Sequence, residues 1–214
     1  MGKNDMTNQY KIIDESKWDR SMHCMVFRNC VEPAFCVTFE ADVTKFRQKV
    51  KEEGLSFTLA FVYAVCKCAN EIEALRYRFL DGKIVLYDRI DTAFTYLNKE
   101  TGLFKVVNVP FVDDLSKYVC LASKMAEQQK EYFTGPLGND VFQCSPMPWV
   151  TYTHISHTNS GKKDNATPLI DWGKYYEKDG KTLMPVSIQA HHSFVDGLHI
   201  GQFVDVLQKY LDNI

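Results

Sequence analysis

The segment His191-His192-Ser193-Phe194-Val195-Asp196-Gly197-Leu198-His199 joins two different hydrophobic patterns. Residues 182–190, before it, are apolar and partly alternating, which is typical of a β-strand. After it, apolar side chains recur at helical spacing, at Phe203, Val204, Leu207, Tyr210 and Leu211. The segment is therefore expected to be a strand-to-helix junction, with Gly197 in a tight turn and Asp196 at the start of the helix.

Two adjacent histidines at the end of a strand point in opposite directions, so only one of them easily faces a given cleft. An imidazole ionises at roughly pH 6.5, so its neutral form can take a proton from an alcohol near neutral pH. A histidine beside a turn is nevertheless more often structural, and short motifs recur by chance. The residues alone leave both a structural and a catalytic role open for His191 and His192.

Composition narrows the class of protein. The chain has 214 residues, of which 45% are hydrophobic, and no linker or repeat divides it, so a single domain over residues 1–214 is expected. The net charge of -2 gives no general attraction to nucleic acid or to anionic lipid. Residues 1–14 lack an apolar signal core, and no apolar run approaches the roughly 20 residues of a membrane span, which predicts a cytoplasmic protein.

Metal and redox sites have little support. The seven cysteines are scattered and form no Cys-x-x-Cys pair. His154, His157 and Asp164 lie close in sequence, but no fourth ligand is evident, and the surrounding Ser, Asn, Gly and Lys residues are typical of an exposed loop. No metal is expected.

Hydrophobic periodicity predicts a set of short strands and amphipathic or buried helices. Besides the C-terminal pair, strands are expected at 34–39, 83–87, 91–97, 104–109 and 149–155, and helices at 18–27, 42–53, 57–72 and 115–132. Strands and helices mix without strict alternation. This order predicts an α/β two-layer sandwich with a mixed, largely antiparallel sheet.

The segment His191-His192-xxx-Asp196-Gly197 resembles the active-site signature of the chloramphenicol acetyltransferases, and its shorter form, His-xxx-Asp-Gly, is shared with other CoA-dependent acyltransferases. Trp18-Asp19-Arg20 is similar to the Trp-x-Arg of that family. Ser145-Pro146-Met147-Pro148-Trp149-Val150 is similar to its Ser-x-x-Pro-Trp-Val, and Glu100-Thr101 followed by Phe104 resembles a further segment. The matches keep the family's order and span almost the whole chain.

The resemblance implies an acetyl-CoA-dependent O-acetyltransferase that acetylates a hydroxyl of chloramphenicol and so confers resistance to this antibiotic. It implies that His192 is the general base and that Ser145 donates its hydroxyl to the oxyanion of the tetrahedral intermediate. It also implies that Arg20 and Asp196 form a bidentate pair that braces the loop carrying the histidine. Transfer would be direct, with acetyl-CoA as a co-substrate and no permanently bound cofactor. The resemblance further implies that the protein is a homotrimer with active sites between its subunits.

The same resemblance implies the residues around the two substrates. Phe27, Phe104 and Trp149 would contact the acceptor, and Lys174 and Tyr175 would lie near CoA. A solvated surface pair is nearly as good an interpretation of Lys174 and Tyr175.

Three departures from the family concern the acceptor. Phe27 stands in place of a tyrosine, residues 152–156 replace an aromatic-rich segment, and Asp171 stands in place of a threonine that helps to hold an active-site water. Two alternatives therefore stay open: the same chemistry on a different alcohol, and a non-catalytic relative that binds CoA or a drug. A dihydrolipoyl acyltransferase core also has His-xxx-Asp-Gly, but the Trp-x-Arg segment favours the drug enzymes.

Overall fold

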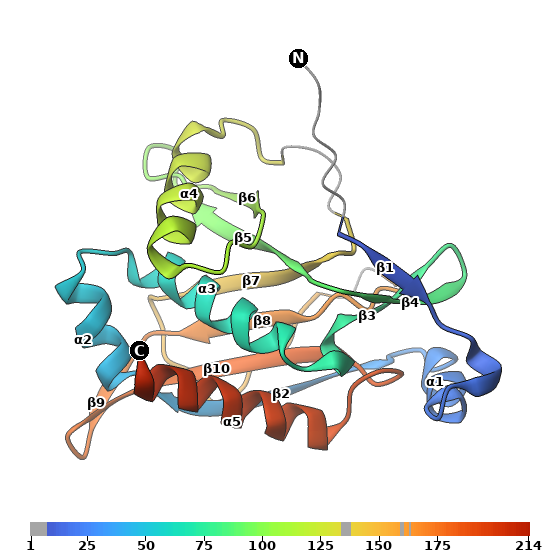
Figure 1. Ribbon diagram of the computed structural model, residues 1–214. Helices are drawn as coiled ribbons and strands as arrows, with labels where there is room; N and C mark the ends of the chain where they lie inside the picture. Colours follow the sequence, from blue (N-terminus) through green and yellow to red (C-terminus); the bar gives the residue numbers. More distant parts are fainter. Residues whose placement is uncertain (1–7, 134–137, 159–160, 163) are drawn as a thin grey trace.

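The structure is a computed structural model that describes residues 8–133, 138–158, 161–162 and 164–214. Residues 1–7 of the polar N-terminal segment and residues 159, 160 and 163 of the predicted exposed loop lie outside the described residues. Figure 1 shows a large twisted sheet with helices packed along one side and a small sheet at one end.

The elements of the described residues follow one another without strict alternation of strand and helix. In chain order they are β1 (Tyr10–Ile12), the 3-10 turn η1 (Glu15–Lys17), α1 (Ser21–Arg28), β2 (Ala34–Asp42), α2 (Thr44–Glu52), α3 (Phe57–Asn70), the 3-10 turn η2 (Glu73–Arg76), β3 (Tyr77–Leu80), β4 (Lys83–Tyr87), β5 (Asp91–Leu97), β6 (Phe104–Val109), α4 (Leu115–Gln128), β7 (Val141–Met147), β8 (Leu169–Gly173), β9 (Tyr176–Lys178), β10 (Lys181–His191) and α5 (Gly197–Asn213).

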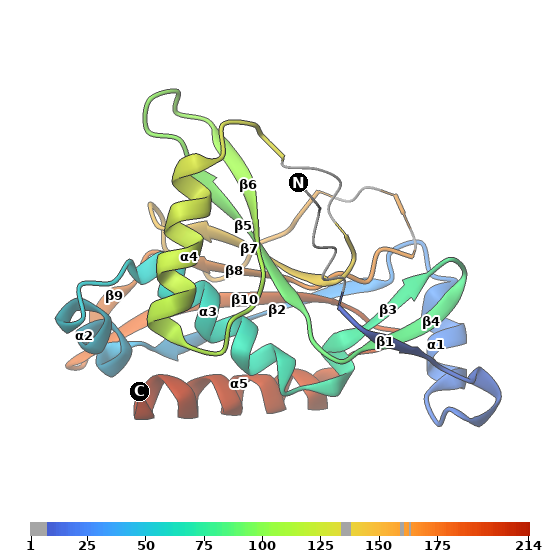
Figure 2. The ribbon, with the colours of Figure 1, turned by 45° about the horizontal axis from the view of Figure 1, so that its top comes forward.

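The large sheet has the strand order β2-β10-β8-β7-β5-β6 in the described part of the chain, with β9 paired to β10. The β5–β7 and β7–β8 pairs are parallel, and the other pairs of this sheet are antiparallel. The small sheet has the order β1-β4-β3, and Figure 2 shows it beside α1. The prediction of an α/β sandwich with a mixed, largely antiparallel sheet is confirmed.

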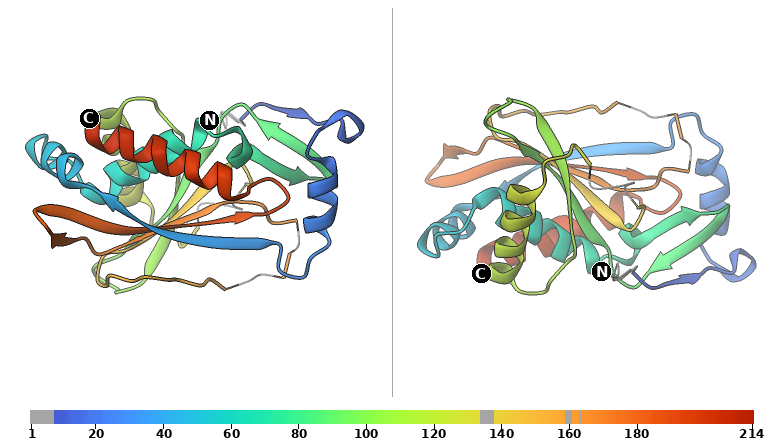
Figure 3. Two further views of the ribbon diagram at one scale, coloured as in Figure 1. Left: turned by 90° about the horizontal axis from the view of Figure 1, so that it is seen from below. Right: turned by 90° about the horizontal axis from the view of Figure 1, so that it is seen from above.

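The helices α2 to α5 lie on one side of the large sheet, and α1 lies at its end (Figure 3). Trp172 of β8 packs against Phe61 of α3, with 4.9 Å between the ring centroids. Strand side chains alternate between the two faces, so Asp171, next to Trp172, faces away from the helices. In the described residues, no helix is both long and apolar enough to pass through a membrane.

The predicted strand at 149–155 is wrong. The strand in this region is β7, which ends at Met147, and a turn at Pro148 and Trp149 follows it. Pro146 lies past Cys144, the last residue of β7 that pairs with β5. Its missing N–H therefore leaves no hydrogen bond unmade on that side of the strand.

The chain after this turn crosses the sheet face opposite the helices, close to the backbone of β8. The N–H of Lys174 donates to the carbonyl of Val150 at 2.8 Å. A Cβ atom on Gly173 would lie 2.7 Å from the same carbonyl oxygen, which is closer than any side chain tolerates. The absence of a side chain at Gly173 therefore allows this segment to cover Asp171.

Candidate active site

The junction between β10 and α5 has the geometry expected from the sequence. His191 is the last residue of β10, and Asp196 is the N-cap of α5. The Asp196 carboxylate accepts a hydrogen bond from the N–H of Leu198 at 3.1 Å, and the Nδ1 atom of His199 accepts one from the N–H of Asp196 at 3.1 Å. This reciprocal pair satisfies backbone donors that the helix leaves unpaired at its start.

The two adjacent histidines occupy opposite sides of the strand end. His191 is buried, and its ring packs on Phe79 and Phe194. The ring of His192 is half-buried and stacks on Phe27 with 3.9 Å between ring centroids, while Phe35 contacts it at 4.6 Å. The stacked ring of Phe27 and the tilted ring of Phe35 together hold the His192 imidazole in place.

One hydrogen bond fixes the tautomer of His192. Its Nδ1 atom lies 2.9 Å from the carbonyl oxygen of Val195. A carbonyl oxygen can only accept, so the Nδ1 atom must carry the hydrogen. In the neutral ring the Nε2 atom then keeps its lone pair, which is the arrangement that a general base requires.

Arg20 connects the backbone around His192 to the start of α5. Its Nε atom donates to the carbonyl of Ser193 at 2.9 Å, its Nη2 atom donates to the carbonyl of His192 at 3.2 Å, and its Nη1 atom contacts the Asp196 carboxylate at 2.9 Å. The expected bidentate pair is therefore wrong in detail: one nitrogen binds the carboxylate and two bind the loop itself. The guanidinium fork suits this role because its donors point in several directions from a rigid plane.

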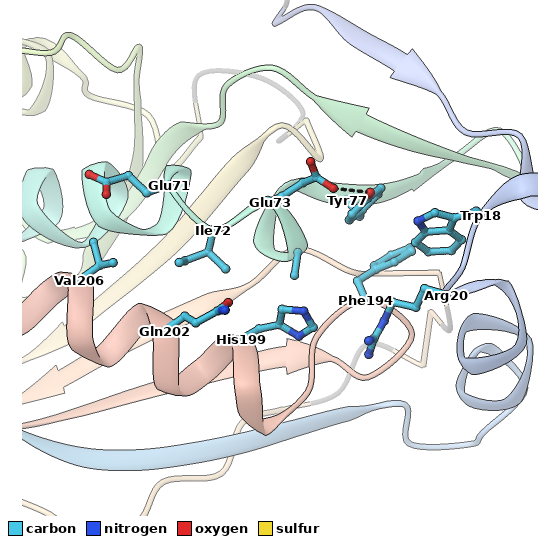
Figure 4. Close-up of a pocket in the computed structure, with 11 residues that line it drawn as sticks. Trp18, Arg20, Glu71, Ile72, Glu73, Tyr77, Phe194, His199, Gln202 and Val206 are labelled. Carbon is cyan, nitrogen blue, oxygen red and sulfur yellow. Dashed lines mark hydrogen bonds between the residues drawn. The ribbon is translucent and has the colours of Figure 1, made fainter.

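Figure 4 shows the surroundings of Arg20. Arg20 lies with Trp18 and Phe194 at one end of a cavity of about 620 Å³, and His199 lines the same cavity. Burial raises the pKa of Asp196, but the hydrogen bonds from Arg20 and from the N–H of Leu198, together with the charges of His199 and Arg20, outweigh burial, so the net effect lowers the pKa. The carboxylate is thus ionised at neutral pH and holds Arg20 against the loop.

Removal of either member of the Arg20–Asp196 pair should weaken both stability and activity. We expect Arg20→Ala to lower the free energy of unfolding by about 2–4 kcal/mol, because two carbonyls and a carboxylate lose a charged donor. Asp196→Ala loses one bond to Arg20 and the helix cap, and should cost about 1–3 kcal/mol. Urea unfolding of both variants and of the double variant measures these losses.

The double variant should cost less than the sum of the single ones, because the two side chains share a contact. Arg20→Lys is the matched control: it keeps the charge but not the planar fork, so we expect an intermediate loss. Strict additivity in this cycle would show that the pair does not act as a unit.

Ser145 lies in a different part of the chain's surface. It is near the end of β7 and lines a cavity of about 720 Å³. Phe104, at the start of β6, and Trp149, in the turn after β7, line the same cavity and are exposed. His157 and Lys99 also line it.

The predicted site residues therefore form two separate groups within one chain. His192, Arg20, Asp196 and Phe27 make up the histidine group, and Ser145, Phe104 and Trp149 make up the serine group. Ser145 is opposite Asp171, and Asp171 is opposite Ser187 of β10. Two strand spacings, and the five residues from 187 to 192, separate Ser145 from His192 by on the order of 20 Å. One chain does not bring the two groups together.

Lys174 and Tyr175 follow β8 and do not line the cavity of Ser145. The Lys174 side chain is exposed. The Tyr175 ring contacts Phe57 at 5.7 Å between centroids, and the guanidinium of Arg47 lies over it at 4.9 Å. One face of this ring is therefore already occupied by a cation.

The weak candidate metal cluster is not assembled. Asp164 pairs with Arg28 at 2.8 Å, and His157 lies 2.8 Å from Asp171 instead. Within the described residues, no group of three or more His, Cys, Asp and Glu side chains is placed to hold a metal ion.

Two features of the site were not predicted from the sequence. Phe35 contacts the His192 ring, and its position depends on the pairing of β2 with β10, which no local motif indicates. His157 reaches the cavity of Ser145 from a segment that the sequence pattern assigned partly to a strand. The pairing of His157 with Asp171 has no sequence signal, because the 13 residues between them contain no repeating pattern.

The fold that carries the histidine group and the serine group is similar to the folds of solved acetyltransferase structures. A chloramphenicol acetyltransferase structure superimposes with a TM-score of 0.87 and 30% identity, covering 95% of this chain and 100% of the other. A probable dihydrolipoamide acetyltransferase from Listeria monocytogenes superimposes with a TM-score of 0.65 and 17% identity, covering 94% and 93%. The second similarity shows the fold alone.

Sequence comparison gives the family. Chloramphenicol acetyltransferase 2 of Haemophilus influenzae is 29% identical over 206 residues, covering 94% of this chain and 97% of the relative. The chloramphenicol acetyltransferase of Proteus mirabilis is 27% identical over 204 residues, covering 94% of both chains. The family model described as chloramphenicol acetyltransferase matches residues 8–208. Because this match covers nearly the whole chain, the protein belongs to the chloramphenicol acetyltransferase family of transferases.

Proposed function

We propose that the protein transfers the acetyl group of acetyl-CoA directly to a hydroxyl of chloramphenicol. The Nε2 atom of His192 takes the proton of the hydroxyl while its oxygen attacks the thioester carbonyl. The Ser145 hydroxyl donates a hydrogen bond to the resulting oxyanion. When the intermediate collapses, the C–S bond breaks and His192 returns the proton to the CoA thiolate. No acyl-enzyme forms, so both substrates are bound together.

The observation that carries this proposal is the tautomer of His192. Its Nδ1 atom is committed to the Val195 carbonyl, so its Nε2 atom is free to accept a proton. A purely structural histidine would have no need of a free nitrogen at the end of a stacked, fixed ring. The family match supplies the class of reaction that such a base serves.

We further propose that the enzyme is a homotrimer in which the histidine group of one protomer faces the serine group of the next. A separation on the order of 20 Å within one chain is far beyond the roughly 3 Å over which a base or an oxyanion donor acts. A second copy of the chain can supply the missing group, because cyclic assembly repeats the same contact around a ring.

The CoA end of the site is proposed at Lys174 and Tyr175. Tyr175 packs on Phe57, and the neighbouring Ser56 lines the cavity of Ser145. The exposed Lys174 ammonium can pair with a phosphate of CoA as a point charge. The guanidinium of Arg47 lies over the Tyr175 ring, so Arg47 can supply a second positive charge for the CoA phosphates.

Release of CoA thiol tests the proposed function. The purified protein is incubated with acetyl-CoA and, separately, with chloramphenicol and a panel of other alcohols, and free thiol is measured. Turnover with chloramphenicol is the expected result. Turnover only with another alcohol would leave the chemistry standing and change the acceptor. Absence of thiol release with every alcohol tested would show a non-catalytic relative.

Phe27 gives a prediction about the acceptor. Its ring stacks on His192, so a hydroxyl added to it would lie beside the predicted base. If the acceptor gains one ordinary hydrogen bond there, worth about 0.5–1.5 kcal/mol, we expect Phe27→Tyr to lower KM for chloramphenicol by up to about tenfold. Phe27→Leu is the control: it loses the flat face against His192, so kcat should fall and KM should not decrease. Unchanged KM in Phe27→Tyr would contradict this role.

A further inference from the structure

A row of polar residues crosses the sheet next to the predicted oxyanion donor. Ser145 of β7 is opposite Asp171 of β8, and Asp171 is opposite Ser187 of β10. Residues paired in this way project from the same face of a sheet, about 5 Å apart at the backbone. Asp171 is only 1% exposed, so a carboxyl group is buried directly beside Ser145.

In the part of the chain that the structure describes, the carboxyl group of Asp171 lies close to the imidazole of His157. Its Oδ2 atom lies 2.8 Å from the Nε2 atom of His157, although the angles are poor for a hydrogen bond. Two lone pairs at this distance would repel each other, so the contact is favourable only when one of the two groups carries a proton. His157 lines the same cavity as Ser145, and its side chain is 15% exposed.

The titratable groups around Asp171 come from three directions. Cys36 of β2, Cys144 of β7 and Tyr152 of the crossing segment all interact with its charge, besides His157. Burial raises the pKa of both thiols and raises the pKa of Tyr152 to about 12, so these three groups are neutral at pH 7. Among the described residues, no lysine or arginine contacts the Asp171 carboxyl group.

The charge of the pair changes near neutral pH. Burial raises the pKa of Asp171 to about 7 and lowers the pKa of His157. Below pH 7 the pair holds a proton and is neutral overall, and above pH 7 it loses this proton and carries one negative charge. That charge lies next to Ser145, where the proposed reaction develops an oxyanion. Like charges at such a distance in a partly buried site slow the reaction by about tenfold to a hundredfold.

We propose that His157 and Asp171 form a positioning pair that supports the oxyanion site of Ser145 only while the pair holds its shared proton, so that acetyl transfer slows in alkaline solution. The pair acts through Ser145 and needs no contact with substrate. This inference rests on the proposed function for the role of Ser145.

The test is the dependence of kcat on pH, from about pH 5.5 to 9.5, measured by thiol release. The wild-type rate should fall on the alkaline side of about pH 7, by about tenfold or more. Asp171→Asn keeps the shape but cannot ionise, so its alkaline fall should be absent. His157→Gln leaves Asp171 without an imidazole partner and should shift the position of the fall. The control is Asp113→Asn, which removes an exposed carboxylate paired with Lys67 and should leave the profile unchanged.

A second measurement does not depend on activity. The imidazole NMR signals of His157 should shift when Asp171, whose pKa burial raises to about 7, loses its proton in the wild type, and this transition should be absent in Asp171→Asn. Asp171→Asn should also melt at a higher temperature than the wild type at pH 8.5, because the wild type then buries an ionised carboxylate. An alkaline fall of kcat that persists in Asp171→Asn would overturn the inference, and so would the absence of the His157 transition. Lack of turnover together with a normal His157 transition would instead overturn the proposed function.

Discussion

Substitution of His192 by alanine should lower kcat for acetyl transfer by about 10²–10⁴-fold while the protein stays folded. The acceptor hydroxyl then has to lose its proton to water, and the departing thiolate has no positioned proton. The His192 ring is half-buried between Phe27 and Phe35, so its loss leaves a gap at the surface rather than in the core. Steady-state thiol release measures the loss of catalysis, and thermal melting of the same sample measures any loss of stability.

The neighbouring histidine is the matched control. His191 is buried, and its Nδ1 atom accepts the N–H of Ser193 at 3.1 Å. His191→Asn keeps an acceptor at this position but removes packing against Phe79 and Phe194. We expect a lower melting temperature with kcat within a few-fold of wild type at a temperature where the variant is folded. Near-normal turnover in His192→Ala would show that another group is the base.

Local patterns predicted much of the fold. The strands at 83–87, 91–97 and 104–109 have the predicted bounds, because a short run rich in apolar and β-branched side chains is flanked by turn residues in each case. The helices at 57–72 and 115–132 end two to four residues earlier than predicted. Their apolar periodicity continues past the last helical turn, so it does not mark where the helix stops.

The errors come from pairing between distant segments. The pattern of residues 149–155 predicts a strand, but the start of this segment lies against Gly173 and the end of β8 instead. The strand β8 was not predicted at all, although it is central, because its five residues carry Asp171 and Trp172 without alternation that is visible locally. Only the register of β7, β8 and β10 explains why an acidic residue is buried there.

Like the fold, the candidate site was predicted only in part. Arg20 and Asp196 are 176 residues apart, and the resemblance to a family was needed to pair them. The two further bonds of Arg20, to backbone carbonyls, carry no sequence signal, because every residue has a carbonyl. The separation of His192 from Ser145 could not be inferred from motif order, since order along the chain says nothing about distance across a sheet.

The distance between His192 and Ser145 within one chain leads to a second prediction with a large effect on activity. If each active site combines His192 of one protomer with Ser145 of the next, two inactive variants should restore activity to each other. His192→Ala lacks the base, and Ser145→Ala lacks the oxyanion donor, whose loss typically lowers kcat by about 10²–10³-fold. The two chains are coexpressed with different affinity tags, and oligomers that carry both tags are purified.

A ring of three protomers that contains both variants has three contacts, whichever variant is present twice. At one contact the intact His192 of a Ser145→Ala chain meets the intact Ser145 of a His192→Ala chain, so about a third of the wild-type activity per trimer should return. A two-fold dimer would return about half instead. Oligomers of each variant alone, carried through the same purification, should stay at their own low rates. Mixed oligomers that are no more active than these controls would show that His192 and Ser145 serve the same chain, and the shared site would have to be abandoned.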